Sequence, residues 1–356
     1  MNKVLLHCRP GFEKDCAAEI TDLAAAAGVY GFPKLEKNSG FVLFEGYAPQ
    51  DGERLMEQLN FGRMIFARSW FVITAELQEM DPSDRISAVM SALEGLPNKS
   101  GKLWVESGEG DAYHSMLSFC RKFTVPLRQA LRQQGRLTKA EKDKMPRIHL
   151  FLTDSSHGYL GYSRSDNGSP FYMGIERLKF PFDAPSRSTL KLDEAFSVFI
   201  APDLQAERVS SGMRAVDLGA CPGGWTYQLV KRGMFVAAVD NGAMAESLME
   251  TGQVTHHPVD GFKFEPEKPG NHWLVCDMIE KPDRVARLMA RWLVNKWCDQ
   301  AIFNLKLPMK QRYAGVCECL NQLTDILSSS GVRYELQAKH LYHDREEITV
   351  YLRRIH

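Results

Sequence analysis

The chain has 356 residues, of which 44% are hydrophobic and 25% are charged, the balance of an ordinary soluble globular protein and not of a disordered one. Because single hydrophobic cores stop growing at about 250–300 residues, this length predicts two or three domains. The 44 basic and 44 acidic residues cancel, which argues against indiscriminate binding to polyanions.

The sequence carries no signal for export, for a membrane span or for a metal site. The apolar run Val4–Leu6 gives way to charge and proline, unlike a signal peptide. No stretch approaches the roughly 18 to 20 apolar residues that a membrane span needs. The eight cysteines show neither CxxC spacing nor a Cys/His ligand cluster. We therefore expect a cytoplasmic protein with reduced thiols, no membrane contact and no metal.

Residues 1–75 are expected to form a small α+β unit. The pattern predicts strands over 3–8, 41–44 and 64–73, and helices over 13–28 and 53–59. Pro10 should open the first helix, because proline is favoured in a first helical turn.

A second α+β unit is expected over 76–165. It should begin with a helix at Asp81, continue with a strand over 102–107 and a basic helix over 114–135, and end with two strands over 147–154 and 158–164. Pro126 should kink or split the basic helix, since proline lacks the N–H that the helix needs.

Positive charge is concentrated in this second unit. Nine basic residues fall between Arg121 and Arg147, against only Glu141 and Asp143. Arginines recur at helical spacing and could form one stripe facing phosphates, although basic helices also serve as plain solvated surface. RNA contacts are expected from Arg121, Lys122, Arg128, Arg132 and Arg136.

The C-terminal half predicts an α/β fold. Turn residues over 166–185 indicate a linker, and from 186 to 356 strands and helices alternate. Such alternation is typical of a mostly parallel sheet with helices on both faces. Two final extended runs, 334–343 and 348–354, predict an antiparallel hairpin at the edge of that sheet.

The stretch Val216–Trp225 (VDLGACPGGW) predicts a buried strand, a tight glycine-rich turn and the start of a helix. Glycines let the backbone approach a ligand, and a helix N-terminus offers free N–H groups to an anion. The spacing lacks the G-x-G-x-x-G of dinucleotide folds, which disfavours a nicotinamide oxidoreductase. It resembles the D-L-G-x-x-P-G-G-[WF] loop of S-adenosylmethionine enzymes that act on RNA. This resemblance implies S-adenosylmethionine contacts from Cys221, Pro222, Gly223 and Gly224.

Two acids follow the glycine loop at strand ends, where ligands bind in open α/β sheets. Asp240, 23 residues after Asp217, is expected to accept hydrogen bonds from a ribose diol, and Asp260 to contact the adenine amino group. Each alone could be a helix cap or a loop acid, but the series favours cofactor binding. His256 and His257 have no carboxylate at ligand spacing, so a metal is not expected.

The segment Ser186–Glu194 (SRSTLKLDE) resembles the S-R-x-x-x-K-L-x-E segment of FtsJ-like ribose 2′-O-methyltransferases, which have a Rossmann-like class I methyltransferase sheet. The resemblance implies cofactor contacts from Ser188 and Asp277. It also implies a Lys-Asp-Lys-Glu tetrad made of Lys191, Asp277, Lys306 and Glu347. Because Glu346 adjoins Glu347, the sequence leaves open which of the two is the glutamate of the tetrad. The glycine loop has Cys221 where the family commonly has alanine.

The order of the units extends the resemblance to the whole chain. A ferredoxin-like start with CRPGFEKD, a THUMP-like RNA-binding unit and an FtsJ-like domain resemble bacterial methyltransferases of the ribosomal large subunit. This implies 2′-O-methylation of a cytidine in 23S ribosomal RNA, either free or in an assembling large-subunit particle. We expect a monomer, because one chain would supply both RNA binding and catalysis.

The chemistry needs a base, because a ribose hydroxyl is a poor nucleophile. Lys306 is the expected base: the nearby Lys191 and the positively charged methyl donor would favour its neutral amine. Asp277 and Glu347 should hold the two lysines in register.

Other targets are disfavoured. Amino-nitrogen methyltransferases usually carry Asn/Asp-Pro-Pro-aromatic where this chain has Cys276–Ile279, and the Pro-Cys nucleophile of base-carbon methylation is absent. The complete set of tetrad residues argues against a catalytically inactive RNA-binding protein.

Overall fold

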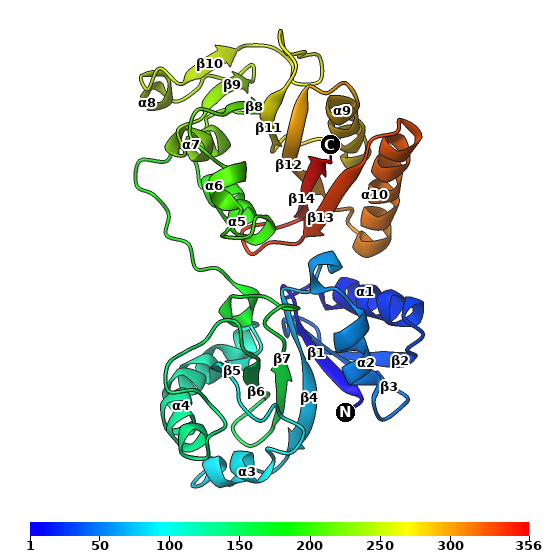
Figure 1. Cartoon of the computed structure of the whole chain (residues 1–356), viewed down its shortest axis with the longest axis vertical. Coiled ribbons are helices and arrows are strands. Elements are labelled where there is room, and N and C mark those ends of the chain that lie inside the picture. The colour runs from blue at the N-terminus through cyan, green and yellow to red at the C-terminus, as the bar shows by residue number, and fades with distance from the viewer. Residues whose placement is uncertain (356) are drawn as a thin grey trace. The chain divides into compact units, whose positions relative to one another are not determined.

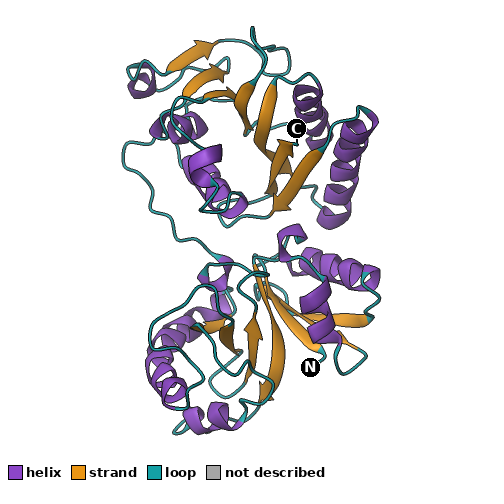
Figure 2. Ribbon diagram, in the orientation of Figure 1, coloured by secondary structure: helices purple, strands orange, loops and turns teal. Residues whose placement is uncertain are grey.

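A computed structural model describes residues 1–355 of the chain. They divide into two compact units, residues 1–176 and the residues from Arg177 onward. Each unit is built on one seven-stranded sheet with helices packed against it (Figures 1 and 2). None of the helices within residues 1–355 is both long and apolar enough to cross a lipid bilayer.

The N-terminal sheet has the strand order β2-β3-β1-β4-β7-β6-β5. Its strands are β1 (Lys3–His7), β2 (Gly31–Leu35), β3 (Phe41–Gly46), β4 (Ser69–Leu77), β5 (Lys102–Ser107), β6 (Arg147–Leu152) and β7 (Gly158–Ser163). Neighbours pair antiparallel, except for the parallel pair β5 and β6. Strand β4 pairs with β1 on one side and β7 on the other, so the two expected α+β units share one continuous sheet.

Four helices accompany this sheet: α1 (Glu13–Ala26), α2 (Asp51–Gln58), α3 (Arg85–Ser91) and α4 (His114–Gln133). Two differ from the sequence-based expectation. Helix α1 begins at Glu13, so Pro10 lies in the preceding turn and not in the first helical turn. Helix α4 runs through Pro126 as one helix and is not split.

The sequence does not predict strand β2, because its five residues include Pro33 and show little alternation. It lies at the edge of the sheet, where one side of a strand needs no N–H donors. Proline is tolerated in that place for this reason. The edge position, set by tertiary structure, therefore explains the missed strand.

The segment 166–185, expected to be a linker, has two parts. Asn167 belongs to the N-terminal unit: its side chain accepts from the N–H of Phe61 at 2.8 Å and donates to the carbonyls of Met56 and Leu59. Met173 is buried, and its N–H donates to the buried Glu106 carboxylate at 3.2 Å. The chain therefore stays packed on this unit as far as residue 176.

The C-terminal sheet has the order β10-β9-β8-β11-β12-β14-β13. Its strands are β8 (Arg214–Leu218), β9 (Phe235–Val239), β10 (Val254–His257), β11 (Asn271–Cys276), β12 (Cys298–Lys306), β13 (Tyr334–Lys339) and β14 (Glu347–Arg354). The first five in this order pair in parallel, and β14 pairs antiparallel with both β12 and β13. The α/β class and the terminal hairpin are thus confirmed.

Helices cover both faces of this sheet (Figure 1). One group is α5 (Thr189–Phe199), α6 (Gln205–Arg208) and α7 (Gly224–Lys231); the other is α9 (Pro282–Val294) and α10 (Arg312–Ser329), with the short α8 (Glu246–Met249) near β10. The core between α5, α7 and the sheet contains the fully buried Phe196, Trp273 and Tyr351. This packing fixes α5 beside the ends of β11 and β12.

Candidate active site

The glycine loop follows β8 and leads directly into α7. Gly219 and Gly223 have φ angles of +78° and +118°, which favour glycine. A Cβ on Gly219 would lie 2.5 Å from Cγ of Met278, and one on Gly224 would lie 2.1 Å from Oγ of Ser188. Side chains are therefore excluded at these positions, and the bare backbone lines the floor of the site.

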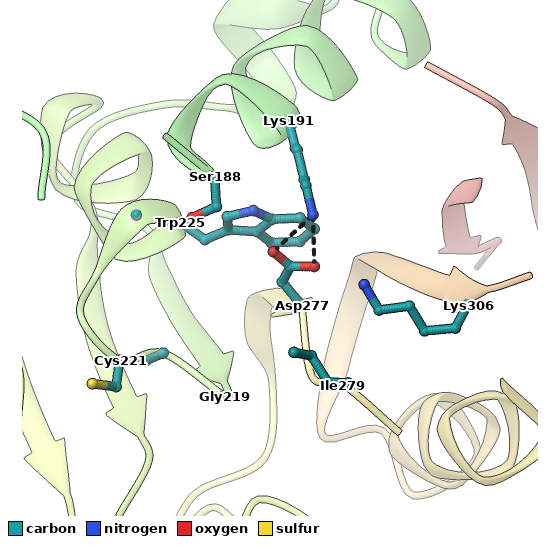
Figure 3. Close-up of a pocket in the computed structure, with 10 residues that line it drawn as sticks. Ser188, Lys191, Gly219, Cys221, Trp225, Asp277, Ile279 and Lys306 are labelled. Carbon is teal, nitrogen blue, oxygen red and sulfur yellow. Dashed lines mark hydrogen bonds and ion pairs between the residues drawn. The ribbon is translucent and has the colours of Figure 1, made fainter. Parts of the chain in front are cut away.

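Two adjoining cavities open at this end of the sheet. The first, called here the lysine cavity, has a volume of about 220 Å³ and is lined by Ser188, Lys191, Gly219, Ala220, Cys221, Gly224, Trp225, Asp277, Ile279 and Lys306 (Figure 3). The second, the aspartate cavity, measures about 530 Å³ and extends from Gly219 and Asp277 to Asp240, Asp260, Phe262 and Arg284. Cys221 and Ile279 line both cavities.

Four charged side chains meet beside the lysine cavity, and three of them line it. Lys191 extends from α5 with its Nζ 3.3 Å from both carboxylate oxygens of Asp277, which follows β11 (Figure 3). Glu347, at the start of β14, contacts Nζ of Lys191 through Oε1 and Nζ of Lys306 through Oε2. Lys306 ends β12 and is the direct partner of Glu347 in the sheet register, which brings the pair together.

The structure distinguishes the two candidate glutamates. Glu346 is exposed and pairs with Arg312 at 3.2 Å, whereas Glu347 is buried between the lysines. Glu347 begins β14 opposite Lys306, whereas Glu346 precedes the strand, so only Glu347 contacts the two lysines.

Glu347 also separates the positive charges that were expected to lie close together. Burial alone would lower the pKa of Lys191, but the carboxylates of Asp277 and Glu347 raise it above its ordinary value. Burial would raise the pKa of Glu347, but Lys191 and Lys306 lower it. Burial raises the pKa of Asp277 despite the neighbouring Lys191. Lys191 is therefore held as an ammonium ion by two carboxylates.

The aspartates expected to bind a nucleoside line the second cavity. Asp240 accepts from the N–H of Cys221 at 3.0 Å and from that of Gly242 at 2.8 Å, so it also braces the glycine loop. Asp260 accepts from the N–H of Phe262 at 2.9 Å.

The other residues of the loop make contacts within the protein. Pro222 and Gly223 are not among the residues that line either cavity, and a Cβ on Gly223 would meet Leu248 at 2.3 Å. Cys221 is exposed and its thiol donates to the carbonyl of Ala243. Asp217 is buried below the loop and accepts from Oγ1 of Thr226 at 2.7 Å.

Sequence reasoning missed a group of neutral or buried side chains next to Asp277. Asn304 donates to Oδ1 of Asp277 at 2.7 Å, and Thr349 lies behind it with its hydroxyl 2.9 Å from Oδ1 of Asn304. The register of β12 and β14 pairs Asn304 with Thr349, two residues from the Lys306 and Glu347 pair. A period of two along each strand could have predicted that these pairs share one face.

The basic residues expected to contact RNA are in the N-terminal unit. Arg121 and Lys122 are exposed on α4, but Arg128, Arg132 and Arg136 are half-buried. Arg132 donates to the carbonyl of Thr138 at 3.2 Å. The expected stripe is therefore only partly open to solvent, and much of the exposed charge comes from Arg121, Lys122, Lys139, Lys142 and Lys144.

Comparisons with known proteins agree along the whole chain. Residues 1–71 match the RlmM ferredoxin-like domain, and residues 84–164 match the N-terminal domain of ribosomal RNA large subunit methyltransferase M. Residues 184–299 match the FtsJ-like methyltransferase domain. Among solved structures, TrmN from Thermus thermophilus covers 100% of both chains at 13% identity with a TM-score of 0.36, too low to support an inference about function.

Relatives named ribosomal RNA large subunit methyltransferase M are similar over their full length. The protein of Photorhabdus sp. (strain Az29) is 58% identical over 355 residues, which cover 100% of this chain and 97% of the relative. Those of Edwardsiella ictaluri and Escherichia coli O9:H4 are 58% and 57% identical, and 95% and 97% of them are covered. The chain therefore belongs to the ribosomal RNA large subunit methyltransferase M family, whose members methylate ribosomal RNA.

Proposed function

We propose that this chain transfers a methyl group from S-adenosylmethionine to the ribose 2′-hydroxyl of a cytidine in 23S ribosomal RNA, free or in an assembling large-subunit particle. The main support is the meeting of Lys191, Asp277, Lys306 and Glu347 beside a glycine loop. We further propose that the chain acts as a monomer and without a metal.

The two cavities suit S-adenosylmethionine. The larger one falls in the range of about 300–1,000 Å³ that is usual for ligand sites. Asp240 and Asp260 offer carboxylates for a ribose diol and an adenine amino group, and the start of α7 offers N–H groups for a carboxylate. Asp277 lies at the junction of the cavities, where its negative charge favours a sulfonium. When bound, this cofactor supplies an activated methyl group on a positively charged sulfur.

Lys306 is the better base of the two lysines. Its side chain is 30% exposed, against 17% for Lys191, and among the described residues one carboxylate contacts it, compared with two for Lys191. In the proposed step, neutral Lys306 Nζ accepts the hydroxyl proton as the 2′-oxygen attacks the methyl carbon and the bond from that carbon to sulfur breaks. Contact with Glu347 fixes the position of Lys306 Nζ relative to the 2′-hydroxyl.

The test uses labelled S-adenosylmethionine and ribosomal RNA. The wild-type protein should place the label in a dinucleotide that resists alkali, because a 2′-O-methyl group blocks hydrolysis. Lys306→Ala should lower kcat by about 10²- to 10⁴-fold and leave cofactor affinity unchanged, since it removes the base alone. Lys310→Ala, an exposed lysine four residues further on, is the matched control and should have wild-type activity.

Two outcomes would contradict the proposal. Label recovered in single nucleotides would indicate methylation of a base and not of the ribose. Wild-type kcat in Lys306→Ala, with the fold intact by circular dichroism, would show that this lysine is not the base.

A further inference from the structure

A row of buried side chains extends from Asp277 into the core of the C-terminal unit. Asn304, Thr349 and Asp344 are 1%, 0% and 0% exposed. Asn304 Nδ2 donates to Oδ1 of Asp277 at 2.7 Å. The Thr349 hydroxyl lies 2.9 Å from Oδ1 of Asn304, and 3.0 and 2.9 Å from the two oxygens of Asp344. The four side chains thus form a continuous hydrogen-bonded row.

The direction of each hydrogen bond in the row follows from the donors available. Because the amide nitrogen of Asn304 donates to Asp277, its oxygen faces Thr349 and can only accept. The single hydroxyl hydrogen of Thr349 can donate to that oxygen or to the Asp344 carboxylate, and both are satisfied together when Asp344 is protonated and donates to Thr349 Oγ1. The hydrogen-bonding groups of the row therefore favour a protonated Asp344. Burial, together with Glu347 and Glu194, raises the pKa of Asp344 well above its ordinary value, in agreement with this direction.

The loop that holds Asp344 is fixed by the helix that carries Lys191. Glu194 lies three residues after Lys191 on α5 and is buried. Its carboxylate accepts from the N–H groups of Tyr342 and His343 at 2.8 and 2.9 Å, and its Oε2 lies 2.7 Å from Nδ1 of His343. Asp344 itself accepts from the N–H of Leu341 at 3.0 Å. Glu194, the last residue of the SRSTLKLDE segment, therefore links α5 to the start of β14.

We propose that Asn304, Thr349 and Asp344 are positioning residues, which fix the rotation of the Asp277 carboxylate so that it faces Lys191 and the sulfonium. This inference rests on the proposed role of Asp277. With Asp344 protonated, the row adds no net charge, so it orients Asp277 without disturbing the charge balance of the two lysines and Glu347. Loss of one hydrogen bond in the row would let the carboxylate rotate, because its other partner, Lys191, donates to both oxygens equally at 3.3 Å.

The test compares Thr349→Val with Thr349→Ser. Valine has the shape of threonine but lacks the hydroxyl, whereas serine keeps it. We expect Thr349→Val to lower kcat for total methyl transfer to RNA by about tenfold, with little change in KM for RNA, and to weaken S-adenosylmethionine binding in calorimetry. Thr349→Ser should recover kcat to within about threefold of the wild type.

A control on the same strand separates positioning from stability. The Tyr351 hydroxyl donates to Oε1 of Gln300 at 2.7 Å, on the same face of β14 but without contact to Asp277. Tyr351→Phe should lower the melting temperature by an amount similar to Thr349→Val and leave kcat unchanged. Equal kcat in Thr349→Val, Tyr351→Phe and the wild type would overturn the proposal.

Asp344→Asn tests the protonated form. An asparagine can donate to Thr349 and accept from Leu341, as the neutral acid does, so we expect activity within about threefold of the wild type. A loss as large as that of Thr349→Val would mean that the carboxylate is needed and would contradict the assigned directions. Total methyl transfer and cofactor affinity do not depend on which RNA atom is methylated. The alkali digest alone tests the ribose assignment, so its failure can be told apart from a failure of the positioning proposal.

Discussion

Glu347 determines the electrostatic character of the site at the scale of single residues. The Glu347 carboxylate contacts the Nζ atoms of both lysines and so fixes their positions, and Lys191 is also paired with Asp277. The position of Glu347 follows from its register with Lys306 and not from chain neighbourhood, since Glu346 faces Arg312. A shift of one residue in this register would remove the tetrad.

Asp217 gives a pH-dependent prediction at the same scale. Burial raises the pKa of Asp217 to about 7, whereas an unfolded chain has an aspartate pKa of about 3.9. Between these values the folded state holds a proton that the unfolded state releases, so this residue's contribution to stability is present below about pH 4 and is lost as pH rises through about 7. Asp217→Asn keeps the bond from Thr226 and cannot ionise. The melting temperature of the variant minus that of the wild type should therefore increase from pH 5 to pH 8.

Thermal melts of both proteins at each pH measure this difference, and Asp203→Asn, at an exposed position in the turn before α6, is a control that should follow the wild type. Parallel curves for Asp217→Asn and the wild type would contradict a raised pKa at this position.

At the scale of elements, helix α4 offers the exposed charge for an RNA contact. Replacing Arg121 and Lys122 together by glutamate should weaken RNA binding and reduce the slope of log affinity against log salt by about 1.4 to 1.8, since two phosphate contacts are lost. Cofactor affinity should not change. Lys37→Glu reverses an exposed charge elsewhere in the same unit and should bind RNA almost as the wild type does.

Filter-binding titrations at several salt concentrations give both quantities. If the double variant binds RNA with unchanged affinity at moderate salt, α4 is not the contact surface.

The same scale shows what the sequence could predict. The lysines and acids of the tetrad were predicted from the resemblance to FtsJ-like methyltransferases, whose motif residues this chain repeats at Lys191, Asp277, Lys306 and Glu347. Asn304 and Thr349 were missed because a polar residue inside a strand is equally typical of a solvated face, and only the pairing of β12 with β14 brings them behind Asp277. Asp344 lies in a loop, and its burial depends on Glu194, 150 residues earlier.

Two other expectations depended on tertiary structure. Arg147 was counted with the surface charges, but it is buried, with its guanidinium 5.1 Å from the ring of Trp104. Pro126 does not split α4, because this helix is held by packing of Leu127, Leu131 and Cys120 against the sheet, which outweighs the one missing hydrogen bond.

At the scale of the whole molecule, an exposed segment without regular structure connects the two units along the chain. Arg177 and Lys179 are exposed there and lie in neither a helix nor a strand. Brief trypsin treatment should cut first at these residues and give two resistant fragments of nearly equal size, because each unit has its own sheet and core.

Mass spectrometry of the fragments identifies the cut. Replacing Arg177 and Lys179 by glutamine should slow this first cleavage, and earlier cuts at the exposed Lys142 or Lys144 would contradict the assignment of 177–185 as the connection between units.

The sharing of β4 by both parts of the N-terminal sheet has a consequence for synthesis on the ribosome. Strand β7, which covers one edge of β4, emerges roughly 80 residues after β4 ends. At about 5–20 residues per second, that edge stays uncovered for roughly 4 to 16 seconds. Its unpaired N–H and C=O groups are a template for strands of other nascent chains. Each nascent chain is therefore prone to aggregate through β4 until translation has reached β7.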